Sequence, residues 1–390
     1  MTISINHFKN NNILENRLSP ILKWAGGKEQ ELKYIHPAMP KTFNRYYEPF
    51  VGGGAVYLSI NKNEIFINDK SYELVDLYNI IKNQNELFFE IINEIIFNWN
   101  SLEKIVNRYS NDFINLYHNF LKDDIGEIDI QNWIIDFSTK NLSQFNDMIQ
   151  NSFNINIENF IKEINKNLFN KIKRMKKIEL EKGKLPDSDI LDNIESALKS
   201  AFYMHFRHLY NNIKKYNIEK SKEVAIFFFI RNFAYSGMFR YNKSGDFNVP
   251  YGGIGYNRKN LYKKIEYLQS KKLKEHLSKT IIDNLDFENF LNKYNPQKDD
   301  FIFLDPPYDS DFSTYAKNEF TQDDQKRLAN YLINKCEAKW MMIIKNTDFI
   351  FNLYNKSNIN IGTFDKKYLV SFQNRNDKNA KHLLIRNYED

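Results

Sequence analysis

The chain has 390 residues, of which 42% are hydrophobic, and this is enough for a sizeable core and about two or three domains. A single cysteine, Cys336, excludes a disulfide framework and a cysteine-based zinc site, and the seven histidines form no metal-binding HExxH pattern, so no metal is predicted. The net charge of +6 permits a polyanionic partner without requiring one. No apolar run approaches the ~18 residues of a membrane span and the N-terminus lacks a secretory pattern, so we expect a cytoplasmic protein without a membrane partner.

The first informative segment is residues 19–28, in which two adjacent glycines lie between Trp24 and Lys28. The glycines predict a tight turn that brings an aromatic ring and a cation to one place, before a helix from about Glu29. A phosphate-binding P-loop is the competing interpretation. It fails because Lys28 is followed by Glu29, where that motif requires Ser or Thr.

Residues 45–48 are predicted to form a short strand, which a glycine-rich turn at residues 49–54 connects to a helix starting near Ala55. Such a turn lets a ligand approach the backbone at a helix N-terminus. The next strand, residues 64–68, ends at Asp69, a place where an acidic residue typically binds ribose hydroxyls. Turn, helix and acid together favour a nucleoside-type ligand, although the third glycine of the dinucleotide fingerprint is missing.

Residues 84–220 contain apolar side chains at helical spacing and no comparable motif, so this segment is predicted to be mostly α-helical. At residues 233–253, two aromatic-rich arms flank a turn at residues 243–246, which predicts a β-hairpin. Arg240 is a bidentate donor suited to a guanine edge, and Tyr235 is a ring that can wedge into stacked bases. These residues fit nucleic acid, but an ordinary hairpin can carry them as well.

An apolar run at residues 301–304 is typical of a buried strand, and it is followed directly by Asp305-Pro306-Pro307-Tyr308. In α/β sheets the carboxyl ends of the strands hold the chemistry. The prolines fix their own φ angles and remove two backbone donors, which leaves the Asp305 carboxylate and the Pro306 carbonyl as acceptors beside the Tyr308 ring. Two acceptors can grip a planar amine while its ring lies on the tyrosine. The competing interpretation is a rigid strand-to-loop turn.

The rest of the chain continues an alternation of strands and helices that resumes at residue 281. Residues 309–318 are predicted to form a polar loop able to act as a flap, and Thr321 with Asp324 resembles a capping box for the next helix. Further strands are predicted at residues 339–344, 368–372 and 382–385, with a polar linker at residues 373–381.

Five segments together resemble the adenine-specific DNA methyltransferases of the deoxyadenosine methylase (Dam) type. They are LKWAGGK (22–28), YEPFVGGGAVYL (47–58), FINDK (66–70), FRYNKSGDFNVPYG (239–252) and LDPPY (304–308). The cofactor motifs come first, a target-recognition segment follows and the LDPPY strand comes last, which is the alpha arrangement of this family. The resemblance extends from about residue 18 to residue 388.

The resemblance implies an α/β fold with a Rossmann-like sheet that binds S-adenosylmethionine, and an inserted, mostly helical target-recognition domain that carries the β-hairpin. Residues 17–83 are expected to bind the cofactor, residues 84–280 to recognise the target and residues 281–390 to form the catalytic part. The implied cofactor-binding residues are Trp24, Lys28, Phe50, Gly52, Asp69 and Asp305. The implied catalytic residues are Asp305, Pro306 and Tyr308, and the implied DNA-binding residues are Tyr235, Arg240, Lys243 and Pro250.

The implied reaction transfers a methyl group from S-adenosylmethionine to the exocyclic amine of an adenine flipped out of double-stranded DNA. We expect a monomer in solution, with a cognate restriction endonuclease as a candidate partner. Arg240 suggests a recognition site that contains GA, such as GATC. Two alternatives stay open at this point: a methyltransferase that acts on RNA or protein amides, and a DNA-binding module without catalysis.

Overall fold

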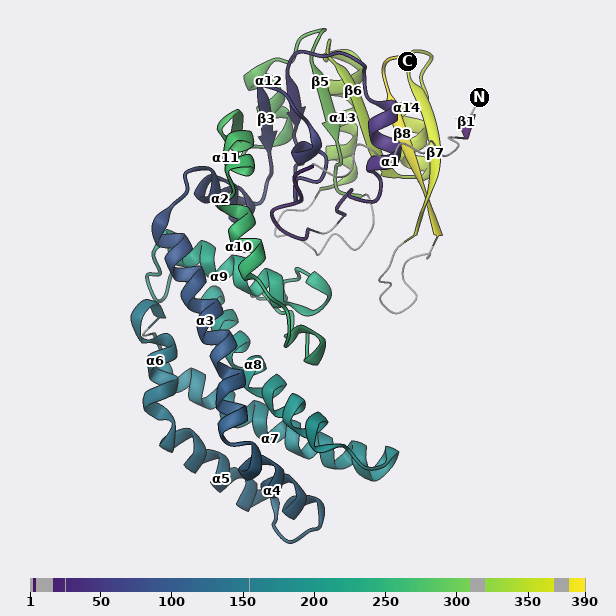
Figure 1. Ribbon diagram of the computed structural model, residues 1–390. Coiled ribbons are helices and arrows are strands. Elements are labelled where there is room, and N and C mark those ends of the chain that lie inside the picture. The colour runs from purple at the N-terminus through teal and green to yellow at the C-terminus, as the bar shows by residue number, and fades with distance from the viewer. Residues whose placement is uncertain are drawn as a thin grey trace. The chain divides into compact units, whose positions relative to one another are not determined.

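The computed structural model describes residues 3–4, 17–24, 26–153, 155–308, 320–367 and 379–389 (Figure 1). The chain forms two compact units. The first comprises residues 1–83, 239–241 and 268–390 and contains the sheet, and the second comprises residues 84–238 and 242–267 and contains most of the long helices. Among the described residues, no helix is long and apolar enough to cross a membrane.

The first unit is built on an eight-stranded sheet in the order β1-β7-β8-β6-β5-β2-β3-β4. Its strands are β1 (Ile3–Ser4), β2 (Tyr46–Glu48), β3 (Ile65–Asn68), β4 (Thr280–Asp283), β5 (Phe301–Leu304), β6 (Lys339–Lys345), β7 (Asn360–Lys367) and β8 (Asn379–Arg386). β8 is antiparallel to β6 and β7, and the other pairs are parallel. The chain runs outward from β2 to β3 and β4 and then returns to β5 on the other side of β2. Ligands bind at such a reversal, beyond the carboxyl ends of the strands.

This sheet confirms the Rossmann-like fold. The strands predicted at residues 45–48, 64–68, 301–304, 339–344 and 382–385 correspond to β2, β3, β5, β6 and β8. The strand predicted at residues 368–372 and the flap predicted at residues 309–318 lie outside the described residues, as does the linker up to residue 378.

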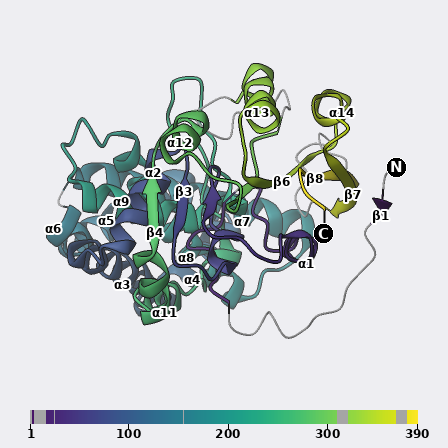
Figure 2. The same ribbon diagram turned by 90° about the horizontal axis from the view of Figure 1, so that it is seen from above.

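Helices cover both faces of the sheet. On one face lie α12 (Phe287–Tyr294), α13 (Gln322–Asn334) and α14 (Asp348–Tyr354), and on the other lies α1 (Leu32–Ala38) (Figure 2). All four residues of β5 are buried, as expected of a central strand with an unbroken apolar sequence. The core under α12, α13 and α14 includes five fully buried side chains: Phe290, Ile302, Leu328, Trp340 and Ile350. The predicted capping box of Thr321 and Asp324 is present at the start of α13.

The second unit is a set of helices packed around an aromatic core, as the helical spacing predicts. The helices are α3 (Glu86–Arg108), α4 (Ser110–Leu121), α5 (Glu127–Lys140), α6 (Leu142–Phe153), α7 (Ile157–Lys182), α8 (Asp187–Asn211) and α9 (Lys220–Phe233). Trp99 of α3 is fully buried, and its ring centroid lies 6.0 Å from that of Phe202 and 4.3 Å from that of Phe233. These contacts join α3, α8 and α9. Residues 262–268 form the short α10 (Tyr262–Leu268).

Residues 268–280, which the sequence assigns to the inserted segment, belong to the first unit. They include α11 (Lys271–Ser278), which packs against α2 (Tyr72–Lys82). The ring of Tyr57 lies between the two helices, with its centroid 4.7 Å from that of His276 and 6.1 Å from that of Tyr78. The chain then enters β4 at Thr280.

One local prediction is wrong, and a second is met only in part. The helix expected near Ala55 is a single 3-10 turn, Tyr57–Ser59, because β3 begins at Ile65 and leaves little chain for a longer helix. The β-hairpin at residues 233–253 has antiparallel contacts between its arms but no regular strands: Ala234 pairs with Tyr251, and Tyr241 and Phe247 are also bridge residues. The predicted turn is present, and within it Asn242 N donates to Asp246 O at 2.8 Å.

Candidate active site

Asp69 lies directly after β3 and binds the glycine turn that follows β2. Gly52 N donates to Asp69 Oδ2 at 2.9 Å, and Ser71 N donates to Asp69 Oδ1 at 2.9 Å. Burial raises the pKa of Asp69 to about 6, although the backbone donors oppose this shift. The carboxylate is therefore oriented by two backbone amides, and each of its oxygens keeps a further lone pair for a hydroxyl donor.

Glycine is required in this turn for two reasons. Gly52 has a φ of +49°, and a Cβ at this position would lie 2.9 Å from Trp24 Cδ1. Trp24 therefore packs directly on the backbone of Gly52. Tyr78 Oη donates to Gly52 O at 3.0 Å, so α2 also fixes the turn. The structure thus brings together Trp24, Gly52 and Asp69, as the sequence predicts for a cofactor pocket.

Phe50, another predicted cofactor-binding residue, is half-buried beside two aromatic rings. Its ring centroid lies 5.7 Å from that of Phe287 and 5.6 Å from that of Phe320. It contributes an apolar surface on the side of α12.

Lys28 and Asp305 form an ion pair at the end of β5. Lys28 is 2% exposed, and its Nζ donates to Asp305 Oδ2 at 2.5 Å and to Gly26 O at 2.7 Å. The glycine turn before Lys28 thus supplies a second acceptor for the buried cation. A buried ammonium needs such partners because its desolvation is costly.

Pro306 is buried and Tyr308 is half-buried, and their backbone is anchored to α13. Gln325 Nε2 donates to Pro307 O at 2.8 Å. Lys28 Nζ also lies 3.4 Å from Tyr308 Oη. The predicted catalytic residues therefore form one connected group with Lys28, and this group lies beyond the carboxyl end of a central strand.

His382 of β8 belongs to the same group and was not predicted. It is fully buried, its Nε2 lies 3.3 Å from Tyr308 Oη, and the two rings meet edge to face with centroids 5.6 Å apart. Nothing in the local sequence indicates this role. It arises because β8 inserts between β6 and β7, which brings the C-terminal segment of the chain close to the end of β5.

Glu48, the last residue of β2, is a second group that was not predicted. It is buried, and its Oε2 accepts a hydrogen bond from Tyr46 Oη at 2.6 Å. Burial raises the pKa of Glu48 well above its usual range, and the Asp305 carboxylate adds to the shift. Glu48 therefore binds a proton more readily than an ordinary carboxyl group does. Its position directly before the glycine turn was the only available signal.

The predicted DNA-binding residues fall in both units. Arg240 is exposed and follows Phe239, whose ring centroid lies 5.9 Å from that of Trp24 in the first unit. Tyr235, Lys243 and Pro250 belong to the second unit, and all three are exposed. Tyr235 precedes Ser236, whose positive φ of +52° places it in the left-handed region. In the described part of the chain, no group of three His, Cys, Asp or Glu residues could hold a metal ion.

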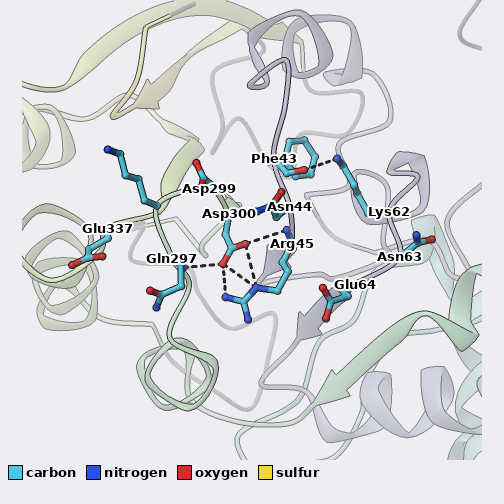
Figure 3. A pocket seen from close by; sticks show the side chains of 11 residues that line it. Phe43, Asn44, Arg45, Lys62, Asn63, Glu64, Gln297, Asp299, Asp300 and Glu337 are labelled. Atoms are coloured by element: carbon cyan, nitrogen blue, oxygen red, sulfur yellow. Dashed lines mark hydrogen bonds and ion pairs between the residues drawn. The ribbon is translucent and has the colours of Figure 1, made fainter.

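A cavity of about 710 Å³ lies at the opposite edge of the sheet, where β2, β3 and β5 begin (Figure 3). Two of its cations already have partners within the cavity. Arg45 Nη2 donates to Asp300 Oδ2 at 2.7 Å, and Lys62 Nζ donates to Phe43 O at 2.5 Å. The ion pair of Arg45 and Asp300 joins the starts of β2 and β5. These two residues therefore have a structural role at this edge of the sheet.

Comparison with known proteins gives a consistent picture. Two overlapping stretches of the chain, residues 24–191 and 133–369, match the family model of D12 class N6 adenine-specific DNA methyltransferases. The chain is 25% identical over 379 residues to the Type II methyltransferase M.CviBI of Paramecium bursaria Chlorella virus NC1A, covering 95% of this chain and 100% of the relative. It is 26% identical over 394 residues to the Type II methyltransferase M.MjaIII of Methanocaldococcus jannaschii, covering 95% of this chain and 99% of the relative.

A third relative is a DNA adenine methylase of Haemophilus influenzae, which is 23% identical over 347 residues, or 86% of this chain and 82% of the relative. The family model spans the glycine turn, the helical unit and the strand that precedes Asp305. The chain therefore belongs to the D12 class N6 adenine-specific DNA methyltransferases, and it transfers methyl groups from S-adenosylmethionine to adenine in DNA.

Proposed function

We propose that the carboxyl ends of β2, β3 and β5 form the methyl-transfer site. The observation that carries this proposal is the connected group of Lys28, Asp305 and Tyr308, which meets beyond β5 although its members come from distant segments. Family membership decides against the two alternatives that the sequence left open, a methyltransferase for RNA or protein amides and a DNA-binding module without catalysis.

The cofactor pocket is assigned to Trp24, Lys28, Phe50, Gly52, Asp69 and Asp305. Trp24 packs on the backbone of Gly52, where a Cβ would collide with it. Asp69 is oriented by backbone amides, including that of Gly52. The two acceptor oxygens of Asp69 fit the ribose hydroxyls of a nucleoside. When bound, S-adenosylmethionine supplies an electrophilic methyl group on a sulfonium.

The target amine is assigned to Asp305 and Pro306. The exocyclic nitrogen of adenine is a poor nucleophile, because its lone pair is delocalised into the ring. The Asp305 carboxylate and the Pro306 carbonyl accept its two hydrogens, which favours a pyramidal nitrogen with an available lone pair. The bound cofactor would supply the methyl group to this nitrogen, which would then release one proton to solvent.

Lys28 has two effects in this arrangement. Its ammonium stabilises Asp305 as a carboxylate, and so keeps an acceptor available for the amine. It also contacts Tyr308 Oη at 3.4 Å, and Tyr308 is assigned to stack on the flipped base. Both groups that meet the adenine are therefore held by one buried cation.

DNA recognition is assigned to the exposed residues Tyr235, Arg240, Lys243 and Pro250, and the helical unit is assigned to target recognition. Arg240 suits a guanine edge, so a site that contains GA, such as GATC, is our proposed target. We further propose a cytoplasmic monomer. A cognate restriction endonuclease is supported as a partner because two relatives are Type II methyltransferases.

Methylation-sensitive sequencing of DNA from cells that express the protein, compared with cells that express Asp305→Ala, tests this proposal. We expect methylated adenines at one short sequence motif in the first sample and none in the second. Methylation in both samples would overturn the assignment of Asp305.

A further inference from the structure

One side of α8 carries four polar residues at every fourth position: Lys199, Tyr203, Arg207 and Asn211. Residues four apart lie on the same side of a helix, so these side chains form a continuous row, which we call the α8 row. The sequence gives no hint of a function for it, because the segment 84–220 shows only helical spacing.

Every member of the α8 row hydrogen-bonds to the backbone of residues 247–257. Asn211 makes two bonds to one residue: its Nδ2 donates to Phe247 O at 3.1 Å, and its Oδ1 accepts from Phe247 N at 2.8 Å. Tyr203 Oη and Arg207 Nη1 both donate to Val249 O, at 3.0 Å and 3.1 Å.

Lys199 completes the row in the core of the second unit. Its Nζ donates to Asn257 O at 2.7 Å and pairs with Glu195 Oε1 at 2.7 Å. Lys199 and Glu195 are 1% and 4% exposed, so this is a buried ion pair. Such a pair contributes little net stability compared with apolar residues, but it strongly disfavours arrangements in which one partner is lost.

Residues 247–251 alternate as a strand does, without belonging to a sheet. Phe247, Val249 and Tyr251 are buried, and Asn248 and Pro250 are exposed. A strand normally satisfies its buried backbone groups by pairing with a neighbour, and a buried group left without a partner is costly. Here the α8 row provides that partner at Phe247 and Val249. This explains why the hairpin expected from the sequence has no regular strands.

We propose that the α8 row fixes the register of this segment and so positions Pro250, one of the residues assigned to DNA recognition, and the turn that precedes the segment. The proposal rests on the assignment of residues 235–250 to DNA recognition. Because side chains alternate with a period of two, a slip of one residue would bury Asn248 and Pro250 and expose Phe247 and Val249. The row residues are positioning residues, since they act on the DNA through the segment they hold.

Asn211→Ala tests the proposal, with Asn212→Ala as a matched control. Asn212 is the next residue, of the same type, and its side chain donates to His208 O of its own helix at 2.8 Å. The readout is the ratio of methylation rates at the cognate site and at sites that differ by one base pair. We expect Asn211→Ala to lower this ratio about tenfold, because two hydrogen bonds are lost, and Asn212→Ala to leave it unchanged.

Affinity for S-adenosylmethionine, measured by calorimetry, should stay the same in both variants, because the assigned cofactor pocket belongs to the first unit. Tyr203→Phe keeps the ring and removes one donor, so it provides a milder second variant if Asn211→Ala does not fold. A loss of rate by the same factor at all sites in the folded variants would show that the row is only structural and would overturn the proposal.

Arg240→Ala in the same assay separates this proposal from the assignment on which it rests. If Arg240→Ala keeps full discrimination, the assignment of Arg240 to base reading fails, whatever the row variants do. If Arg240→Ala loses discrimination at one base pair while Asn211→Ala and Tyr203→Phe keep it, only the role of the α8 row is overturned.

Discussion

Lys28 Nζ lies 2.5 Å from Asp305 Oδ2, although the two residues are 277 positions apart in the chain. The side chain of Lys28 is 2% exposed and that of Asp305 is 19% exposed. Loss of one partner from such a pair leaves an uncompensated buried charge, which typically costs about 3–5 kcal/mol. Loss of Asp305 leaves the buried ammonium of Lys28 without its carboxylate, so we expect a destabilisation on this scale. Any test of Asp305 must therefore separate chemistry from stability.

Replacement of Asp305 by Ala should lower the single-turnover rate of methyl transfer by on the order of 100-fold or more, because the amine loses its charged acceptor. It should also lower the melting temperature, because Lys28 loses its partner. DNA binding in a gel shift should persist, since phosphate contacts supply most of that affinity.

The double variant Lys28→Met/Asp305→Ala separates the two effects. It removes both charges and keeps an apolar chain in the buried position, so the melting temperature should recover while methyl transfer stays lost. Recovery of methyl transfer together with stability would show that Asp305 acts only through the fold.

Cofactor affinity should depend on pH through Asp69, whose pKa of about 6 lies above its ordinary value of 3.8. The folded protein holds this proton more tightly than the unfolded chain does. Ionisation of Asp69 therefore costs folding free energy, and this cost is absent below about pH 4 and fully present above about pH 6. Binding has the opposite requirement, because ribose hydroxyls need the carboxylate as acceptor. Calorimetry should show affinity weakening by about tenfold for each pH unit below 6.

Asp69→Asn provides the control for this titration. The amide cannot ionise, so its cofactor affinity should be weaker than that of the parent protein at pH 8 and flat between pH 5 and pH 8. A parent protein with the same affinity across this range would remove Asp69 from the cofactor site.

The sequence predicts those parts of the fold in which a local pattern is sufficient. The apolar run of β5 and the glycine turn with Asp69 are examples, because burial and turn geometry are encoded within a few residues. His382 could not be found this way, since its contact with Tyr308 depends on where β8 enters the sheet. The same holds for Glu48, whose raised pKa results from burial by the whole unit.

The predicted hairpin shows a more specific limit. The aromatic-rich arms and the turn at residues 243–246 predicted extended arms, and in the structure residues 247–251 alternate between buried and exposed. The local sequence does not show which groups bind the backbone of this segment, because those groups lie on α8. Asn211, for example, is 36 positions before Phe247. A period of two predicts an extended segment, but it does not show whether a neighbouring strand or a row of helix side chains hydrogen-bonds to the backbone of that segment.

Gly52→Ala should weaken both the fold and the cofactor site. The backbone φ of +49° is strained for alanine, and the new Cβ would lie 2.9 Å from Trp24 Cδ1, so the tryptophan ring must move. We expect a lower melting temperature and a weaker affinity for S-adenosylmethionine by calorimetry.

Gly183→Ala is the matched control, because Gly183 has a φ of +101° and no atom within 4 Å of the added Cβ. It should lower the melting temperature through backbone strain and leave cofactor affinity unchanged. Equal cofactor affinity in Gly52→Ala and the parent protein would contradict the placement of Trp24 in the pocket.

His382 should affect methyl transfer only through Tyr308. His382 Nε2 lies 3.3 Å from Tyr308 Oη and Lys28 Nζ lies 3.4 Å from it, so the hydroxyl is held between two nitrogens. His382→Phe fills a similar volume and removes the polar contact, which typically contributes about 1 kcal/mol. We expect a rate about fivefold lower in single-turnover methylation, and a weaker fluorescence increase when 2-aminopurine replaces the target adenine, because the flipped base is held less well.

The same substitution in a Tyr308→Phe background decides whether His382 positions the ring or only supports the fold. Without the hydroxyl, the polar contact is already absent, so His382→Phe should have no further effect on the rate. A double-mutant cycle measures this difference directly. An equal fivefold loss in both backgrounds would mean that His382 acts independently of Tyr308, most simply through the packing of β8, and the positioning role would be wrong.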